Sequence, residues 1–172
     1  NNDPAAIFNL GVSGDTSDDL LARLENETKV RATEELAFVI AIGVNDARTK
    51  AGANYSDTNR YKQNLGEIER LAKQYTNKVL FVGLTPCVEE RTNPVSWSDT
   101  GYTNGRIQDF NNTLREFCSE NQVQFVDAFE PFATAQAKNE LLPDGIHPND
   151  AGHQLIADLI MPKLQEVLAP TI

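Results

Sequence analysis

A carboxylate and an imidazole stand three residues apart near the C-terminal end of the chain, in an Asp-Gly-Ile-His-Pro segment at 144–148. Pro143 and Pro148 bracket the pair, and together with the enclosed glycine they predict a stiff loop rather than a helical turn. An aspartate beside a histidine on such a loop can hold the imidazole in one tautomer, ready to take a proton from a nucleophile. The alternative is that Asp144 only begins a turn and His147 is an ordinary surface residue.

The length and charge of the chain narrow the classes of protein to consider. Its 172 residues predict one domain with a sizeable apolar core. The formal net charge is −10, and the acids are spread along the chain. Because an acidic surface repels phosphate backbones, we expect no nucleic-acid partner. No apolar run is long enough to span a bilayer. The sequence leaves the oligomeric state open.

The cysteines and histidines do not indicate a metal site. Cys87 and Cys118 match no metal-ligand spacing, and the only histidines are His147 and His153, so we expect no structural zinc. We expect His153 to lie on the surface. A disulfide between the cysteines is left open, although Cys118 falls on the apolar stripe of a predicted helix, which favours a buried thiol. The chain shows no signal peptide; its compartment is left open, with the cytoplasm slightly favoured.

Apolar runs and amphipathic stripes alternate along the chain. The runs predict buried strands at Ala5–Leu10, Leu36–Ile42, Val79–Leu84 and Val123–Asp127. Every position of the second run is apolar, so we expect helices to cover that strand on both faces. Between the runs the pattern predicts helices after Asp15–Ser17, around Tyr61–Tyr75, around Ile107–Cys118, weakly over Pro131–Asn139, and from about Asn149, with a kink or break at Pro162. This alternation predicts an open three-layer α/β/α sandwich with a parallel sheet, of flavodoxin-like type.

Three polar features follow strands or precede the last helix in this arrangement. Ligand sites of open parallel sheets lie at the carboxyl ends of the strands, where Gly14, Asn45 and the 144–148 segment would meet. A backbone N–H at a helix start and a side-chain amide are the usual oxyanion donors. With Asp144 and His147 the set is that of an acyl-transfer site whose nucleophile is missing. The alternatives are that Gly14 serves only backbone geometry and that Asn45 only closes its strand.

Three segments of the chain resemble signature blocks of the SGNH hydrolases, the GDSL-type esterases and lipases. They are Asn-Leu-Gly-Val-Ser-Gly-Asp-Thr at 9–16, Gly-Val-Asn-Asp at 43–46 and Asp-Gly-Ile-His-Pro at 144–148. They occur in the order of the family, and the resemblance covers essentially the whole chain. It implies that Gly14 and Asn45 are oxyanion-hole donors. It also implies that His147 is the general base and that Asp144 orients it.

The fourth block of the family, a Gly-Asp-Ser segment carrying the nucleophilic serine, has no counterpart here. The Gly-Asp-Thr-Ser stretch at 14–17 is superficially similar, but Thr16 occupies the place of the serine. Ser13 and Ser17 are the only nearby surrogates, and we do not favour them. Asp46 is expected to brace its loop. The resemblance therefore implies an N-terminally incomplete domain over residues 1–172, whose serine lies upstream of Asn1.

The missing block also has a structural consequence. In this family the first strand lies inside the sheet, between the second and third strands. Without it, we expect either that the strand at Ala5–Leu10 is detached or that Leu36–Ile42 has an exposed apolar edge. Direct pairing of these two strands would contradict the hypothesis of an upstream segment.

Three functions are compatible with these patterns. The first is a serine ester hydrolase acting through an acyl-enzyme on a small-molecule ester, without metal or organic cofactor. The second is a non-catalytic binding or interaction module that lacks the nucleophile. The third, a nucleotide-binding or receiver domain, is disfavoured because the turn after the first strand fits no phosphate motif. The long irregular stretch at 87–104 is typical of a functional loop, and its Trp97 and Tyr102 could line a substrate pocket or simply pack the loop down.

Overall fold

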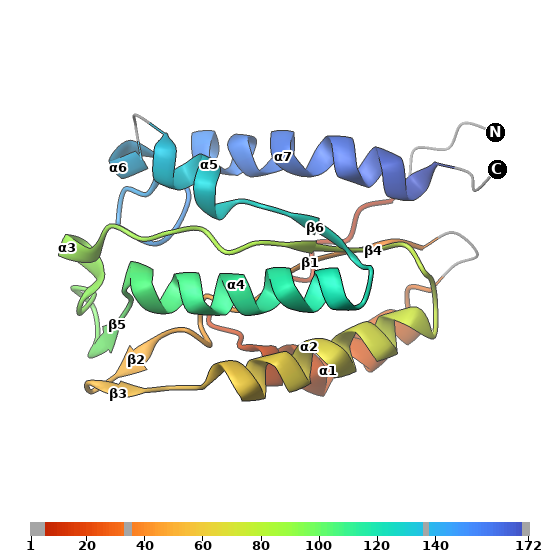
Figure 1. Cartoon of the computed structure of the whole chain (residues 1–172), viewed down its shortest axis with the longest axis horizontal. Coiled ribbons are helices and arrows are strands. Elements are labelled where there is room, and N and C mark those ends of the chain that lie inside the picture. The colour runs from red at the N-terminus through yellow and green to blue at the C-terminus, as the bar shows by residue number, and fades with distance from the viewer. Residues whose placement is uncertain (1–5, 33–35, 136–137, 170–172) are drawn as a thin grey trace.

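A parallel sheet of three strands forms the middle layer of the molecule. The computed structural model describes residues 6–32, 36–135 and 138–169. The strand order is β1 (Phe38–Ala41), β4 (Val79–Val82), β6 (Gln124–Val126). Helices α1, α2 and α4 form the layer on one side, and α7 packs on β4 and β6 from the other (Figure 1). The predicted three-layer α/β/α architecture is confirmed, with a shortened sheet.

The helices follow the apolar stripes of the sequence. The long ones are α1 (Ser17–Lys29), α2 (Thr58–Lys73), α4 (Asn104–Glu120) and α7 (Asp150–Leu168), and the short ones are α3 (Glu89–Thr92), α5 (Phe129–Thr134) and α6 (Lys138–Leu141). Thr16 is the N-cap of α1 and forms a capping box with Asp19. The single weak helix predicted at 131–139 is wrong, since α5 ends at Thr134 and α6 starts at Lys138.

Helix α7 continues through Pro162, where the sequence predicted a kink or break. A proline inside a helix leaves the carbonyl four residues earlier without its donor. Both Pro162 and Asp158, which carries that carbonyl, are exposed. Water can therefore satisfy the carbonyl, and the helix does not end there.

The core is built around β4. All four residues of this strand are buried, and their side chains alternate between the two helical layers. The fully buried side chains from α2 and α4 pack on the strand face that carries Phe81; they include Tyr61, Leu65, Ile68, Ile107, Phe110 and Leu114. Both cysteines are buried thiols, as favoured for Cys118.

Strand β1 is half-covered, which corrects the expectation that both of its faces are buried. It pairs in parallel with β4, so that Val39 lies beside Leu80 and Ala41 beside Val82. Leu80 and Val82 are buried, but Val39 is 43% exposed and Ala41 is exposed too. The physical reason is that α7 packs on β4 and β6 and leaves this face of β1 open.

The prediction of a strand at Ala5–Leu10 is wrong for residues 6–10, and Ala5 lies outside the described residues. The described part has no regular structure, and Ile7 is 93% exposed. A strand needs a partner for its backbone groups, and this segment has none in the described ranges. It does not pair with β1, whose only partner there is β4. Residues 6–10 thus lie outside the sheet, and in the described ranges the edge of β1 away from β4 is open.

A second, antiparallel sheet joins two loops that are far apart in the sequence. Its order is β3 (Ala53–Asn54), β2 (Thr49–Lys50), β5 (Thr100–Gly101). Thr49 lies opposite Gly101. This pairing brings the loop after β1 against the long segment that follows β4, at the end of the sheet where β2, β3, β5 and α3 gather (Figure 1).

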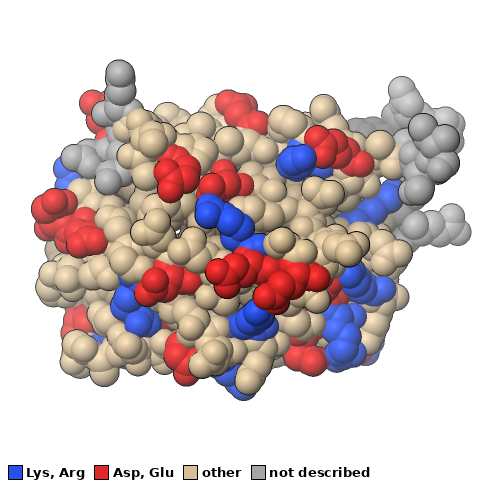
Figure 2. All heavy atoms as spheres, viewed as in Figure 1, with Lys and Arg blue, Asp and Glu red and all other residues tan. Residues whose placement is uncertain are grey.

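The surface shows acidic and basic side chains side by side. On the face in Figure 2, acidic groups are interspersed with basic ones. Several of them form exposed ion pairs, such as Arg60 with Asp18 and Lys62 with Glu120. Within the described ranges, no helix has both the length and the apolar character needed to cross a bilayer.

Candidate functional site

Asp144 and His147 form a closed hydrogen-bonded unit on the loop before α7. One carboxylate oxygen of Asp144 accepts the backbone N–H groups of Ile146 at 3.0 Å and of His147 at 2.8 Å. Its other oxygen accepts the His147 ring Nδ1–H at 2.6 Å. Asp144 therefore forms the turn and orients the imidazole at the same time. With Nδ1 donating to the carboxylate, Nε2 is left as a proton acceptor.

The ionised form of Asp144 is favoured. Partial burial opposes ionisation, but the hydrogen bonds from the backbone of His147 and Ile146 and from the His147 ring outweigh it and lower the pKa of Asp144. The side chain of His147 is 67% exposed. An accessible imidazole backed by a carboxylate is suited to taking a proton from a group that approaches from outside.

The loop that carries this pair is anchored by a glycine. Gly145 has a φ of 98°, and a Cβ at this position would lie 2.7 Å from Cγ2 of Thr92 and 2.9 Å from Cβ of Arg91. Its carbonyl accepts the backbone N–H of Val88 at 2.8 Å. Only glycine combines this backbone conformation with so close an approach. The loop is therefore held directly against α3 and its N-cap.

Gly14 and Asn45 form the second part of the site. Gly14 has a φ of 86° in the turn before α1, and within the described residues its N–H has no hydrogen-bond partner. The Asn45 side chain donates from Nδ2 to the carbonyl of Asp15 at 3.0 Å. The structure thus brings the amide of Asn45 to the turn that presents Gly14. One N–H of the Asn45 amide remains for a ligand.

Asp46 braces this part from inside, as expected. Its carboxylate accepts the backbone N–H of Ser17 at 3.0 Å and the Ser17 hydroxyl. The Asn64 side chain also donates to the Ser17 hydroxyl, at 2.8 Å. Burial raises the pKa of Asp46 even though its hydrogen bonds to Ser17 oppose the shift. This network fixes the first turn of α1, and with it the position of Gly14, relative to the end of β1.

Tyr102 links the two parts of the site. Its hydroxyl donates to Oδ1 of Asn45 at 2.9 Å. Its backbone N–H donates to the carbonyl of Thr92 at 2.7 Å, and the Thr92 hydroxyl donates back to the carbonyl of Tyr102 at 3.0 Å. Thr92 is also the residue against which Gly145 packs. A continuous set of contacts therefore runs from Asn45 to the loop of His147.

Trp97 lies beside His147 rather than deep in the loop. The two rings are nearly parallel, with centroids 6.3 Å apart and an interplanar angle of 27°. The indole is exposed. It offers an apolar surface next to the imidazole. Trp97 therefore adjoins His147, whereas Tyr102 adjoins Asn45, and no hydrogen bond within the described ranges joins His147 directly to Asn45 or Gly14.

No local sequence pattern indicates Thr92 or the contact between Tyr102 and Asn45. That contact depends on the pairing of β2 with β5, and strands of two residues show no periodicity. Thr92 sits in the four-residue helix α3, which is too short for an amphipathic stripe. Gly101 is required in β5 because a Cβ there would lie 2.7 Å from the Thr49 hydroxyl.

A nucleophile for His147 is not found among the described residues. Ser17 is fully buried and bound to Asp46, so it cannot act as the surrogate considered from the sequence. Ser13 is exposed and makes no hydrogen bond to His147. In the described ranges no hydroxyl donates to Nε2 of His147. No three His, Cys, Asp or Glu side chains in those ranges gather in a way that could hold a metal ion.

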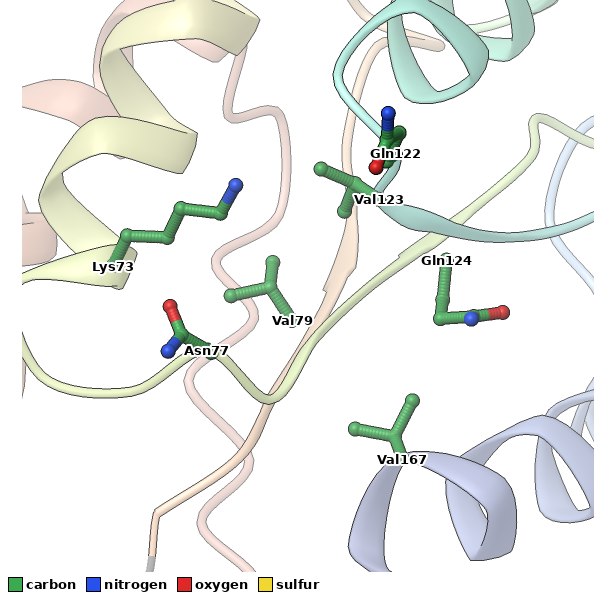
Figure 3. Close-up of a pocket in the computed structure, with 7 residues that line it drawn as sticks. All are labelled: Lys73, Asn77, Val79, Gln122, Val123, Gln124 and Val167. Atoms are coloured by element: carbon green, nitrogen blue, oxygen red, sulfur yellow. The ribbon is translucent and has the colours of Figure 1, made fainter. Parts of the chain in front are cut away.

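A pocket at the other end of the sheet is separate from this site. Figure 3 shows it at the amino ends of β4 and β6, where Val79 and Gln124 lie, with Lys73 and Val167 on its rim. Its polar groups are amides and one ammonium. None of the side chains predicted for the site lines it.

One comparison with known proteins identifies a family. The model of the GDSL-like Lipase/Acylhydrolase family matches residues 1–155. A comparison with curated proteins gave no match.

Solved structures share the fold at low sequence identity. A lipase/acylhydrolase from Enterococcus faecalis has a TM-score of 0.73 at 22% identity, covering 92% of this chain and 75% of that chain. A GDSL-like lipase from Bacteroides thetaiotaomicron has a TM-score of 0.75 at 23% identity, with the same coverages. An acetylxylan esterase from Geobacillus stearothermophilus has a TM-score of 0.68 at 21% identity, covering 90% of this chain and 69% of that chain.

Proposed function

The chain belongs to the GDSL-like lipase/acylhydrolase family, and we propose that it provides the general base and two oxyanion donors of a serine ester hydrolase. The observation that carries the proposal is the Asp144–His147 pair, with Nδ1 bound to the carboxylate at 2.6 Å and an exposed ring. That geometry leaves Nε2 free to act as a base. The substrate is a small-molecule ester.

The reaction proceeds in two halves. The Oγ of a serine attacks the ester carbonyl carbon while His147 takes the hydroxyl proton at Nε2. The bond to the leaving alcohol breaks, His147 gives that alcohol its proton, and an acyl-enzyme remains. Water, activated by His147, then releases the acid. Gly14 N–H and the free N–H of Asn45 donate to the oxyanion in both halves. This chemistry requires no metal or organic cofactor.

We place the serine on a segment upstream of Asn1. The open face and edge of β1 support this placement, because one more strand beside β1 would cover Val39 and end near Asn45. The exposed apolar residues Ile7 and Phe8 would gain cover from the same strand. Trp97, exposed beside His147, then provides apolar surface for the acyl or alcohol part of the ester.

Labelling with a fluorophosphonate tests this assignment directly. The full-length gene product should react at one serine N-terminal to Asn1, and His147→Ala should abolish the reaction. His153→Ala is the matched control, since His153 is an exposed histidine of α7 outside the site. Mapping the label to a serine inside residues 1–172 would refute the placement. No labelling, together with no hydrolysis of p-nitrophenyl acetate, would favour a non-catalytic binding module instead.

The oxyanion role of Asn45 has its own quantitative test. Asn45→Ala in the active protein should lower kcat by about 10²–10³ fold, the loss typical of one such donor. Its KM for p-nitrophenyl acetate should change little, because the donor acts mainly on the charge that develops in the transition state. Asn54→Ala, in exposed strand β3, is the control. An unchanged kcat in Asn45→Ala would exclude the role.

A further inference from the structure

The orientation of the Asn45 amide is set at both of its ends. Nδ2 donates to the carbonyl of Asp15 at 3.0 Å, and Oδ1 accepts the Tyr102 hydroxyl at 2.9 Å. Rotating the amide by half a turn would place Oδ1 against the Asp15 carbonyl, an unfavourable contact of two acceptors. The amide plane is therefore fixed, and so is the direction of its second N–H.

Tyr102 is itself held rigidly. Both of its backbone groups are bonded to Thr92, at 2.7 and 3.0 Å, and the Cys87 thiol adds a longer contact of 3.6 Å to its carbonyl. Its side chain is buried. Burial raises the pKa of the Tyr102 phenol, although the charge and hydrogen bonding of Arg48 oppose the shift. The hydroxyl therefore stays protonated near neutral pH and remains a donor.

A donor on Oδ1 also changes what the amide can do. Hydrogen bonds in a chain polarise one another, so a proton on the carbonyl oxygen makes the N–H groups of the same amide better donors. Here the series of hydrogen bonds runs from the Tyr102 hydroxyl through the Asn45 amide to the group that its free N–H contacts. Because every donor in the series points toward that group, the arrangement favours an anion there.

We propose that Tyr102 is a positioning residue that holds and polarises the Asn45 amide for the oxyanion, rather than a residue that contacts the substrate. The inference rests on the proposed function, because it assumes that Asn45 stabilises an oxyanion. Through Thr92, on which Gly145 packs, Tyr102 also keeps the amide in register with the loop of His147.

Tyr102→Phe removes the hydroxyl and leaves the ring in place. In the active full-length protein, kcat should fall about 5- to 20-fold with KM nearly unchanged, less than for Asn45→Ala. The double variant Asn45→Ala/Tyr102→Phe should be no slower than Asn45→Ala, because Tyr102 acts only through that amide. If the kcat losses of the two single variants multiplied in the double variant, the proposal would be overturned and direct contact of Tyr102 with the substrate would be indicated. Tyr75→Phe, beyond the end of α2, is the matched control.

Two further measurements keep the test decisive. The first uses NMR on the 172-residue chain. The signals of the Asn45 side-chain amide can be assigned through their loss in Asn45→Asp. They should shift in Tyr102→Phe and not in Tyr75→Phe; unshifted signals in Tyr102→Phe would overturn the proposed contact.

The second measurement applies if Tyr102→Phe unfolds. A 3-fluorotyrosine at position 102 preserves the hydroxyl donor, so kcat should stay within about twofold of wild type. A loss of kcat as large as that of Asn45→Ala would contradict the positioning role. A wild-type protein without esterase activity refutes the proposed function, whereas an active protein unaffected by Tyr102→Phe refutes only the positioning role.

Discussion

Asp46 and Asp144 both accept backbone N–H groups of the loops that build the candidate site, yet their surroundings are opposite. Asp46 is 1% exposed and lies beneath the first turn of α1. The Asp144 side chain is 36% exposed. Burial raises the pKa of Asp46. Partial burial is the largest single influence on the pKa of Asp144 and opposes ionisation, but three hydrogen bonds to its carboxylate together outweigh it and lower the pKa.

The difference separates two tasks that carboxylates perform in one site. A buried carboxylate that accepts several hydrogen bonds fixes the backbone around it, and its loss leaves those donors unsatisfied. An exposed carboxylate can orient a histidine that must remain accessible to a reacting group. Substitution at Asp46 should therefore affect mainly stability, and substitution at Asp144 mainly catalysis.

The largest effect is expected for Asp144→Asn in the full-length protein. The amide can still accept the backbone N–H groups of Ile146 and His147, but it can present its NH₂ to the ring and stabilise the wrong tautomer. We expect kcat to fall by about 10³–10⁴ fold, while the free energy of unfolding changes by less than about 1 kcal/mol. Ester hydrolysis and urea unfolding measure the two quantities. Asp150→Asn, exposed at the start of α7, should leave both unchanged. A loss of stability that accounts for the lost activity would erase the distinction between the two aspartates.

Asp46→Ala should have the next largest effect, on stability. It removes the acceptor for the Ser17 N–H and hydroxyl in a buried place, which costs about 3 kcal/mol of unfolding free energy. Asp46→Asn keeps one oxygen acceptor and should cost about 1 kcal/mol. Asp57→Ala is the matched control, because Asp57 caps α2 through two backbone N–H groups in an exposed place and should cost about 1 kcal/mol. Equal losses for Asp46→Ala and Asp57→Ala would show that burial adds nothing.

The fold could be predicted where a pattern is long and local. The stripes of α2 and α4 predicted these helices because each extends over enough residues to show its period, and the unbroken apolar run at β4 predicted a buried strand. The segment at 6–10 is also mostly apolar, yet it forms no strand, because a strand is stabilised by a neighbour that the described ranges do not supply. Local sequence cannot report on the presence of a partner.

The same distinction holds within the site. Asp144 and His147 were found because three residues separate them, so one loop is enough to join them. Asn45 and Tyr102 are brought together across the pairing of β2 with β5, which no local pattern encodes. The sequence predicts that Tyr102 either lines a pocket or packs its loop down, and its hydrogen bond to Asn45 is visible only in three dimensions.

The smallest expected effect is the pH dependence of stability, where the two aspartates should act with opposite signs. The folded pKa of Asp46 is raised above its ordinary value of 3.8, so the unfolded chain loses this proton first as pH rises. The contribution of Asp46 to stability should therefore fall as pH increases from about 4 through its folded pKa. The folded pKa of Asp144 is lowered below 3.8, so its contribution is present above that pH and is lost as pH falls through the folded value.

Urea unfolding of wild type, Asp46→Asn and Asp144→Asn between about pH 3 and pH 7 separates the two contributions. The stability of wild type relative to Asp46→Asn should decline on going from pH 4 to pH 7, with most of the change above 3.8. Relative to Asp144→Asn it should rise with pH, with the change confined to pH values below about 4. Asp18, whose charge adds to the raised pKa of Asp46, should steepen the first decline, so Asp18→Asn should flatten it slightly. If both differences changed in the same direction with pH, burial would not be what distinguishes the two carboxylates.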